Sequence, residues 1–241
     1  MDALWLSDEE ALSNALWAFK HITDNKETVL TRLLTTEIIG RILALILSHS
    51  KQVSDPALEC LGNISVNEDD CGLMLAGCGV MEALKKLIEA SRSKSTRREQ
   101  CWILSNLVAC GPAVISSFIE EKMHLVIAPL LKGSNISVVK EATWVMCNCL
   151  TKGSNRQVKN LIEEGVLGEL LKLLEMNDMN VRYLILDTIH KMLTEIHNAE
   201  VIFLIISQMK EETILNQVQA IKRFHKEMQM KNEELERLRR Q

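Results

Sequence analysis

Short apolar segments alternate with polar breaks along most of the chain, and the same order of segments recurs. Apolar segments begin at Glu37 (EIIGRILALIL), Gly79 (GVMEALKKLI), Lys122 (KMHLVIAPLL) and Gly165 (GVLGELLKLL), with spacings of 42, 43 and 43 residues. A shorter segment such as VISSFIEE or VKNLIEE precedes them, and a break such as KGSNIS or EMNDMN follows. The pattern predicts a repeated unit with a short first helix, an apolar second helix and a third helix after the break.

The predicted third helices carry a second mark of the same repeat. REQCWILSN (98–106) and KEATWVMCN (140–148) align at a shift of 42 residues, which superimposes a glutamate, a tryptophan and an asparagine. In this frame the asparagine position is occupied by His21, Asn63, Asn106, Asn148 and His190, and the tryptophan position by Trp17, Glu59, Trp102, Trp144 and Leu186. Three helices in about 40 to 47 residues are typical of armadillo repeats. We therefore expect an all-α, right-handed armadillo solenoid.

This frame divides the chain into three parts. Residues 1–198 are predicted to form about five repeats, residues 199–230 a degenerate capping repeat that lacks the tryptophan and asparagine, and residues 231–241 a charged tail. At the start, Ser7 is the expected cap of the first helix, with Trp5 packed against the first turn.

Composition agrees with packed helices and narrows the function. The 241 residues are 47% hydrophobic, yet aromatic residues make up 4% and proline occurs three times. The net charge is −4 and the pI is about 5.9, which argues against nucleic acid as a partner. No apolar run reaches the roughly 18 residues of a membrane span, so no membrane association is expected. The seven cysteines do not have the spacing of metal ligands, so we expect no metal or other cofactor. The sequence contains no phosphate-binding loop or nucleophile motif, so we do not expect an enzyme.

The third helices nevertheless have an unusual face. Residues at i and i+4 share one face of a helix, so Trp144 lies next to Asn148, and Glu141 joins them from three residues upstream. An aromatic, an amide and a carboxylate together fit neither an aliphatic core nor a purely charged surface. One interpretation is a structural tryptophan with an asparagine that bonds the neighbouring helix; the other, which we favour, is a surface that binds a lysine or arginine side chain from another chain.

The segments DPALECLGNIS, REQCWILSNL and KEATWVMCNCLTKGSNRQVKNLIEEGVLGELLKLL resemble importin-α, the armadillo family that binds nuclear localisation signals. The resemblance covers nearly the whole chain and corresponds to about the fifth to tenth repeats of that family. It implies that an extended basic peptide lies along the third helices. Tryptophan rings would then hold lysine stems, while asparagine amides would bond the peptide main chain.

By this resemblance the peptide-binding residues are Trp102, Asn106, Trp144 and Asn148, with Glu99, Glu141, Asn63, Glu59 and Trp17 beside them. Trp102 with Asn106 and Trp144 with Asn148 match the minor peptide site. Glu59 replaces an arginine that is usual in the family and could attract a further basic side chain. His21 replaces the amide next to Trp17, so we expect Trp17 to contribute less than Trp144.

The resemblance also implies partners and a location. Basic signal peptides of cargo proteins are the expected ligands, an export receptor could bind the C-terminal repeats, and the protein would work in both cytoplasm and nucleus. The repeats of the major peptide site and the basic segment that binds importin-β have no counterpart in this sequence, so a stable complex with importin-β is not expected. The alternative function is an armadillo scaffold that does not use the groove.

Overall fold

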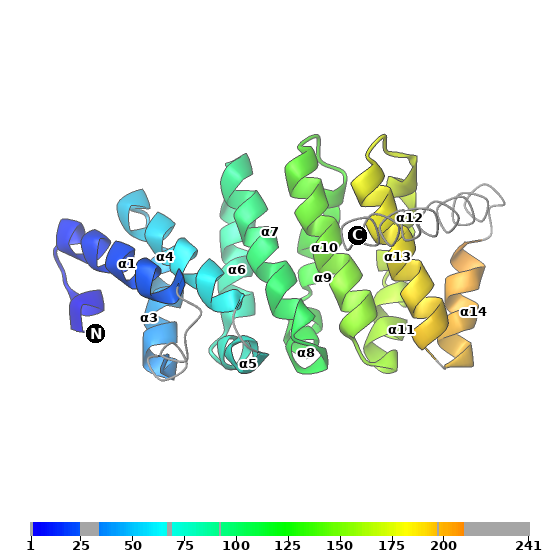
Figure 1. Ribbon diagram of the computed structural model, residues 1–241, viewed down its shortest axis with the longest axis horizontal. Coiled ribbons are helices and arrows are strands. Elements are labelled where there is room, and N and C mark those ends of the chain that lie inside the picture. The colour runs from blue at the N-terminus through cyan, green and yellow to red at the C-terminus, as the bar shows by residue number, and fades with distance from the viewer. Residues whose placement is uncertain (1, 25–33, 67–68, 92, 197, 210–241) are drawn as a thin grey trace, which may run out of the picture.

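In a computed structural model of the protein, described for residues 2–24, 34–66, 69–91, 93–196 and 198–209, the helices form one extended row (Figure 1). Five long helices lie next to one another along one side of the row: α1 (Glu9–Asp24), α4 (Lys51–Ser65), α7 (Lys94–Ala109), α10 (Ile136–Lys152) and α13 (Met179–Glu195). We call these the third helices. They are the helices on which the repeated tryptophan and asparagine positions fall.

The remaining helices complete the units behind and below the third helices (Figure 1). The second helices are α3 (Thr36–Ile46), α6 (Val80–Ala90), α9 (Met123–Leu131) and α12 (Val166–Lys172), which continues into η2 (Leu173–Glu175). The first helices are α5 (Asp69–Gly77), α8 (Pro112–Glu120), α11 (Asn155–Glu163) and α14 (Ala199–Gln208), and η1 (Asp2–Trp5) precedes α1. All regular elements of the described ranges are helical, which confirms the all-α armadillo prediction.

The polar breaks in the sequence start the third helices by capping them. Ser93, Asn135 and Asp178 each precede a third helix, and their side-chain oxygens accept hydrogen bonds from Thr96 N, Val138 N and the N–H groups of Asn180 and Val181. These bonds satisfy amide groups that have no partner inside the helix, each contributing about 1 kcal/mol. The polar residues thus determine where these three helices begin.

A left-handed residue separates each first helix from the second helix that follows. Gly79 and Gly165 have φ angles of 83° and 87°, and Lys122 occupies the same place with φ 54°. Glycine adopts this conformation without a steric penalty, whereas a residue with a Cβ atom does not. The turn therefore explains the glycines at the start of two of the apolar segments.

The core runs continuously through the row because neighbouring units pack on one another. Leu16 of α1, Leu61 of α4, Leu104 of α7 and Ile185 of α13 are completely buried and belong to one hydrophobic cluster. Each third helix contacts the next one along the row. A single unit could not bury these side chains by itself, so each unit depends on its neighbours for stability.

The start of the chain differs in detail from the prediction. α1 begins at Glu9, and it is Asp8, not Ser7, whose carboxylate accepts a hydrogen bond from Ala11 N at 2.8 Å. Leu4 is the buried residue of η1, whereas Trp5 is exposed. The branched aliphatic side chain of Leu4 fills the space against the core for which we expected the indole.

The division into five repeats, a cap and a tail remains a prediction. Within the predicted cap, α14 is described, while residues 210–230 and the charged tail 231–241 lie outside the described residues. None of the helices in the described ranges has the length and apolar character needed to cross a membrane.

The left-handed turn generates a prediction about stability. Lys122→Gly should raise the free energy of unfolding by about 1 kcal/mol, because it removes the Cβ clash of a left-handed residue. The reverse change, Gly165→Lys, should lower it by about the same amount. Denaturant unfolding followed by circular dichroism measures both, and shifts of the same sign for the two variants would contradict this explanation.

Candidate functional site

The tryptophans of the third helices differ in their exposure. Trp17 and Trp144 are 42% and 48% exposed, which is unusual for such large apolar side chains. Trp102 is half-buried and packs on the neighbouring third helix, where a Cβ atom on Gly62 would lie 2.9 Å from its ring. Among the third-helix tryptophans, therefore, only Trp17 and Trp144 present a wide aromatic surface to a ligand.

The asparagines of the third helices are bound to the preceding unit. Asn63 Nδ2 donates to Lys20 O at 3.1 Å and to Thr23 Oγ1 at 3.2 Å. Asn148 Nδ2 donates to Ser105 O at 3.0 Å. Asn106 makes the corresponding bond with its Nδ2, to Ser65 Oγ at 3.2 Å. The amide nitrogens thus join successive third helices, as the structural interpretation of these residues predicts.

The oxygen atoms of two of these amides remain accessible for bonding. No donor among the described residues bonds Oδ1 of Asn106 or Asn148, and both side chains are half-buried, not sealed in the core. An amide oxygen with a fixed orientation is a good acceptor for a main-chain N–H group. The same asparagine can therefore hold two helices together and bond a ligand.

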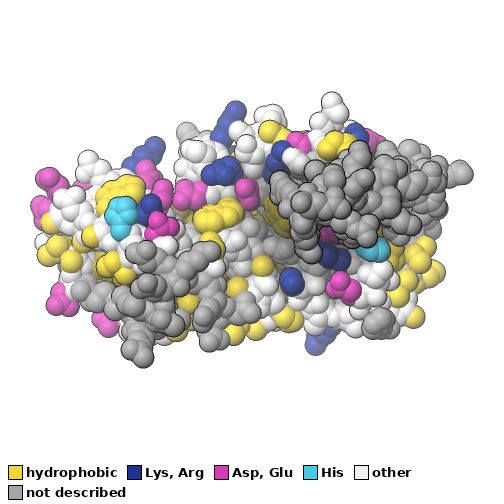
Figure 2. Space-filling view, in the orientation of Figure 1, with side chains coloured by type: hydrophobic (Ala, Val, Ile, Leu, Met, Phe, Trp, Pro, Cys, Tyr) yellow, Lys and Arg dark blue, Asp and Glu magenta, His cyan; other side chains and the backbone are white. Residues whose placement is uncertain are grey.

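Carboxylates gather between α4 and α7. Glu59, at a tryptophan position, lies 3.7 Å from Lys20 Nζ. Burial, together with the negative charges of Glu59 and Asp55, raises the pKa of Glu99 to about 7 against the opposing effect of Arg98. Figure 2 shows acidic and apolar side chains next to one another on this side of the molecule. The surface has the charge that a basic ligand requires.

Glu141 is already paired within the protein. Its Oε1 atom lies 3.9 Å from Nη1 of Arg98 on the preceding third helix. On the same helix, burial and then the charge of Glu141 raise the pKa of Cys101. Burial raises the pKa of Glu141 itself, while Arg98 lowers it. Glu141 therefore faces α7, although in sequence it lies three residues before Trp144.

Two pockets show which residues face each exposed tryptophan. Trp17 shares an open pocket of about 580 Å³ with Pro56 of α4, and Trp144 shares one of about 320 Å³ with Tyr183 of α13. The partner is in both cases 39 residues further along the chain, and the same step from Trp102 leads to Glu141. In both pockets, the residue three before the tryptophan position of one repeat thus faces the tryptophan of the preceding repeat.

The sequence analysis missed several residues of these pockets. Glu10, Ser13, Asn14, Lys51, Gln52 and Asp55 line the Trp17 pocket together with Pro56. Lys140, Asn180, Val181, Leu184 and Asp187 line the Trp144 pocket together with Tyr183. The 39-residue step could have identified Pro56 and Tyr183. The others depend on the distance between adjacent helices, which the repeat alone does not contain.

The tryptophan positions end at α13. Leu186 is buried, so the last third helix offers no aromatic surface at this position, and His190 is exposed.

Among the described residues, no group of three or more His, Cys, Asp or Glu side chains could hold a metal ion. All seven cysteines are free thiols, five of them buried, and burial raises the pKa of Cys60 and Cys147 to about 12.

The raised pKa of Glu99 predicts how stability depends on pH. Because the folded protein holds this proton more tightly than the unfolded chain, stability is lost as pH rises from about 4.5 to about 7. Glu99→Gln removes the charge and should stabilise the protein at pH 8 by about 1 kcal/mol, after allowance for solvent screening of this half-buried group. At pH 4.5 the two proteins should be nearly equal in stability.

Denaturant unfolding at the two pH values measures this difference. Glu120→Gln, at an exposed position of α8, is the control and should change stability little at either pH. A Glu99→Gln variant that is no more stable than the parent at pH 8 would show that the ionised Glu99 side chain does not destabilise the folded protein.

Comparisons with known proteins agree with this architecture. No protein-family model matches the chain. The chain is 27% identical over 171 residues to importin subunit alpha-4 of Arabidopsis thaliana, covering 71% of this chain and 32% of the relative. It is 27% identical over 186 residues to importin subunit alpha-3 of the same plant, covering 77% of this chain and 35% of the relative. The chain thus spans about a third of the length of these relatives.

A solved structure shares the fold over most of the chain. It is a designed armadillo repeat protein in complex with the peptide (KR)4, with a TM-score of 0.78 and 23% sequence identity. The match covers 91% of this chain and 95% of the designed protein. By sequence the chain is thus similar to importin-α subunits, and by fold it is an armadillo-repeat protein.

Proposed function

We propose that the third-helix face binds an extended basic peptide of the nuclear localisation signal type. The observation that carries the proposal is the exposure of Trp17 and Trp144 on this face, each over a pocket shared with the next third helix. A cation above an indole ring gains roughly 0.5 to 2 kcal/mol, depending on how far it is desolvated. The carboxylates between α4 and α7 add long-range attraction.

The asparagines supply the second part of this mechanism. The free Oδ1 atoms of Asn106 and Asn148 can accept hydrogen bonds from the main chain of a peptide, for a net gain of about 1 kcal/mol each. Such bonds would place the peptide without selecting its side chains. The tryptophans would then select the positive charge.

Similar proteins support this choice of ligand. The relatives are named as importin-α subunits, and the designed armadillo protein holds a peptide of alternating lysine and arginine. We further propose that the ligands are cargo proteins that carry such signals. The protein itself would then move between cytoplasm and nucleus.

A scaffold that does not use this face is the second candidate. It is favoured by the amide nitrogens of Asn63 and Asn148, which bond the preceding helix, and by Arg98, which already pairs with Glu141. Each of these contacts would be retained in a protein whose function is only structural. The exposed indoles have no such explanation, so the peptide-binding proposal is the stronger one.

Titration with a labelled (KR)4 peptide tests the proposal. Two tryptophan pockets and two amides, set against the cost of ordering the peptide, predict a Kd of about 10 μM to 1 mM. The Kd should rise with salt, because ions screen the attraction between the peptide and the acidic face. Trp144→Ala and Trp17→Ala should each weaken binding about 3- to 10-fold, which corresponds to the loss of one cation–π contact.

Two controls make the result specific. Phe203 on α14 is an exposed aromatic residue outside the third helices, so Phe203→Ala should leave the Kd unchanged. A neutral peptide of the same length should not bind. Equal binding of (KR)4 by the parent and both tryptophan variants, or no binding by a folded parent, would favour the scaffold.

A further inference from the structure

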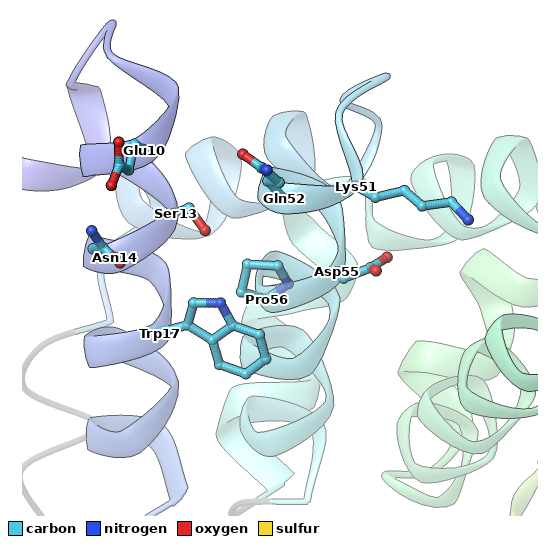
Figure 3. A pocket seen from close by; sticks show the side chains of 8 residues that line it. All are labelled: Glu10, Ser13, Asn14, Trp17, Lys51, Gln52, Asp55 and Pro56. Atoms are coloured by element: carbon cyan, nitrogen blue, oxygen red, sulfur yellow. The ribbon is translucent and has the colours of Figure 1, made fainter.

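The pocket beside Trp17 lies in a gap between α1 and α4, and a ring from each helix lines it. In Figure 3 the indole of Trp17 projects from α1 toward the ring of Pro56 on α4, and Ser13 and Gln52 lie on facing helices next to this gap. Pro56 is buried, whereas the indole of Trp17 is exposed and presents a flat aromatic surface to this gap. A planar group that enters the pocket can therefore lie against the indole.

The rim of this pocket is rich in hydrogen-bond acceptors. Glu10 and Asp55 contribute carboxylates, and within the described residues neither of them forms an ion pair. Lys51 is the one basic residue of the lining, and it extends away from Trp17 (Figure 3). Two carboxylates and one ammonium group leave the lining with a formal charge of −1.

Pro56 adds one more acceptor. In a regular helix its N–H group would donate to the carbonyl oxygen of Gln52, four residues earlier, but proline has no N–H group. The main-chain oxygen of Gln52 therefore lacks its ordinary helical donor, and Gln52 lines the pocket. A ligand with several N–H groups could supply that donor.

The Trp144 pocket differs in charge. Its Lys140 lies 2.9 Å from Asp178, and its Asp187 lies 2.8 Å from Lys191. Both charged groups in this lining already have partners, so the pocket attracts a cation less strongly. The sequence had suggested that Trp144 would contribute more than Trp17, whereas the charges around the two pockets favour Trp17.

We propose that the Trp17 pocket binds an arginine side chain in preference to lysine and is the main anchor for a basic peptide. A guanidinium group is planar, weakly hydrated and has five N–H donors, so it can lie on the indole while donating hydrogen bonds to an acceptor of the pocket lining such as the Asp55 carboxylate. An ammonium group is strongly hydrated and cannot stack in this way. The inference rests on the proposed function, since it assigns the anchor residue of the same peptide.

Peptides of eight arginines and of eight lysines, titrated against the same variants, test the assignment. The parent should bind the arginine peptide about tenfold more tightly than the lysine peptide. Trp17→Ala and Asp55→Asn should each reduce this ratio to about two or less. Trp144→Ala is the matched control, and it should weaken both peptides while leaving the ratio near ten.

The outcomes separate this inference from the function on which it rests. Circular dichroism first confirms that each variant is folded, as expected for changes at exposed side chains. If neither peptide binds the parent, the proposed function fails and the inference with it. If both peptides bind but with equal affinity, or if the ratio persists in Trp17→Ala, peptide binding stands and the arginine site is wrong.

Discussion

Burial of apolar surface between neighbouring units is the constraint on which the structure depends. A unit of three helices has more apolar surface than it can cover itself, so it is stable only when the next unit packs against it. Asparagines reinforce this contact, because Asn63 and Asn148 donate hydrogen bonds to main-chain carbonyls of the preceding third helix. The distance between units follows from this packing, and so do the width and lining of the pockets between them.

The sequence predicted the architecture well because the repeat has a direct physical origin. The spacing of 42 to 43 residues reflects one packed unit, and Gly79 and Gly165 mark a turn that few other residues adopt easily. Lys122 occupies the same turn without being glycine, and the apolar segment after it identified the unit. Periodicity in the apolar residues thus outweighed the one unfavourable residue.

The sequence predicted the candidate site less completely, because neighbours across a pocket come from different units. Trp102 and Trp144 have nearly the same local sequence, yet Trp102 packs over Gly62, whereas the equivalent position facing Trp144 is Ser105. The absence of a side chain at Gly62, where Ser105 has a Cβ and an Oγ atom, is consistent with the deeper position of Trp102. Likewise, Glu141 was assigned to the tryptophan of its own helix, but its contacts lie with α7. Such facts require the distance and rotation between helices, which no local motif contains.

Each asparagine can bond both a neighbouring helix and a ligand, and this has a consequence for the evolution of such proteins. Because Nδ2 of Asn148 joins two helices, selection for a stable fold preserves this residue even in a descendant that no longer binds any ligand. The exposed indole of Trp144 has no such structural role, and its apolar surface in contact with water is unfavourable unless a ligand covers it. Among distant armadillo sequences, a persistent asparagine therefore reports ancestry, whereas a persistent exposed tryptophan reports a working surface.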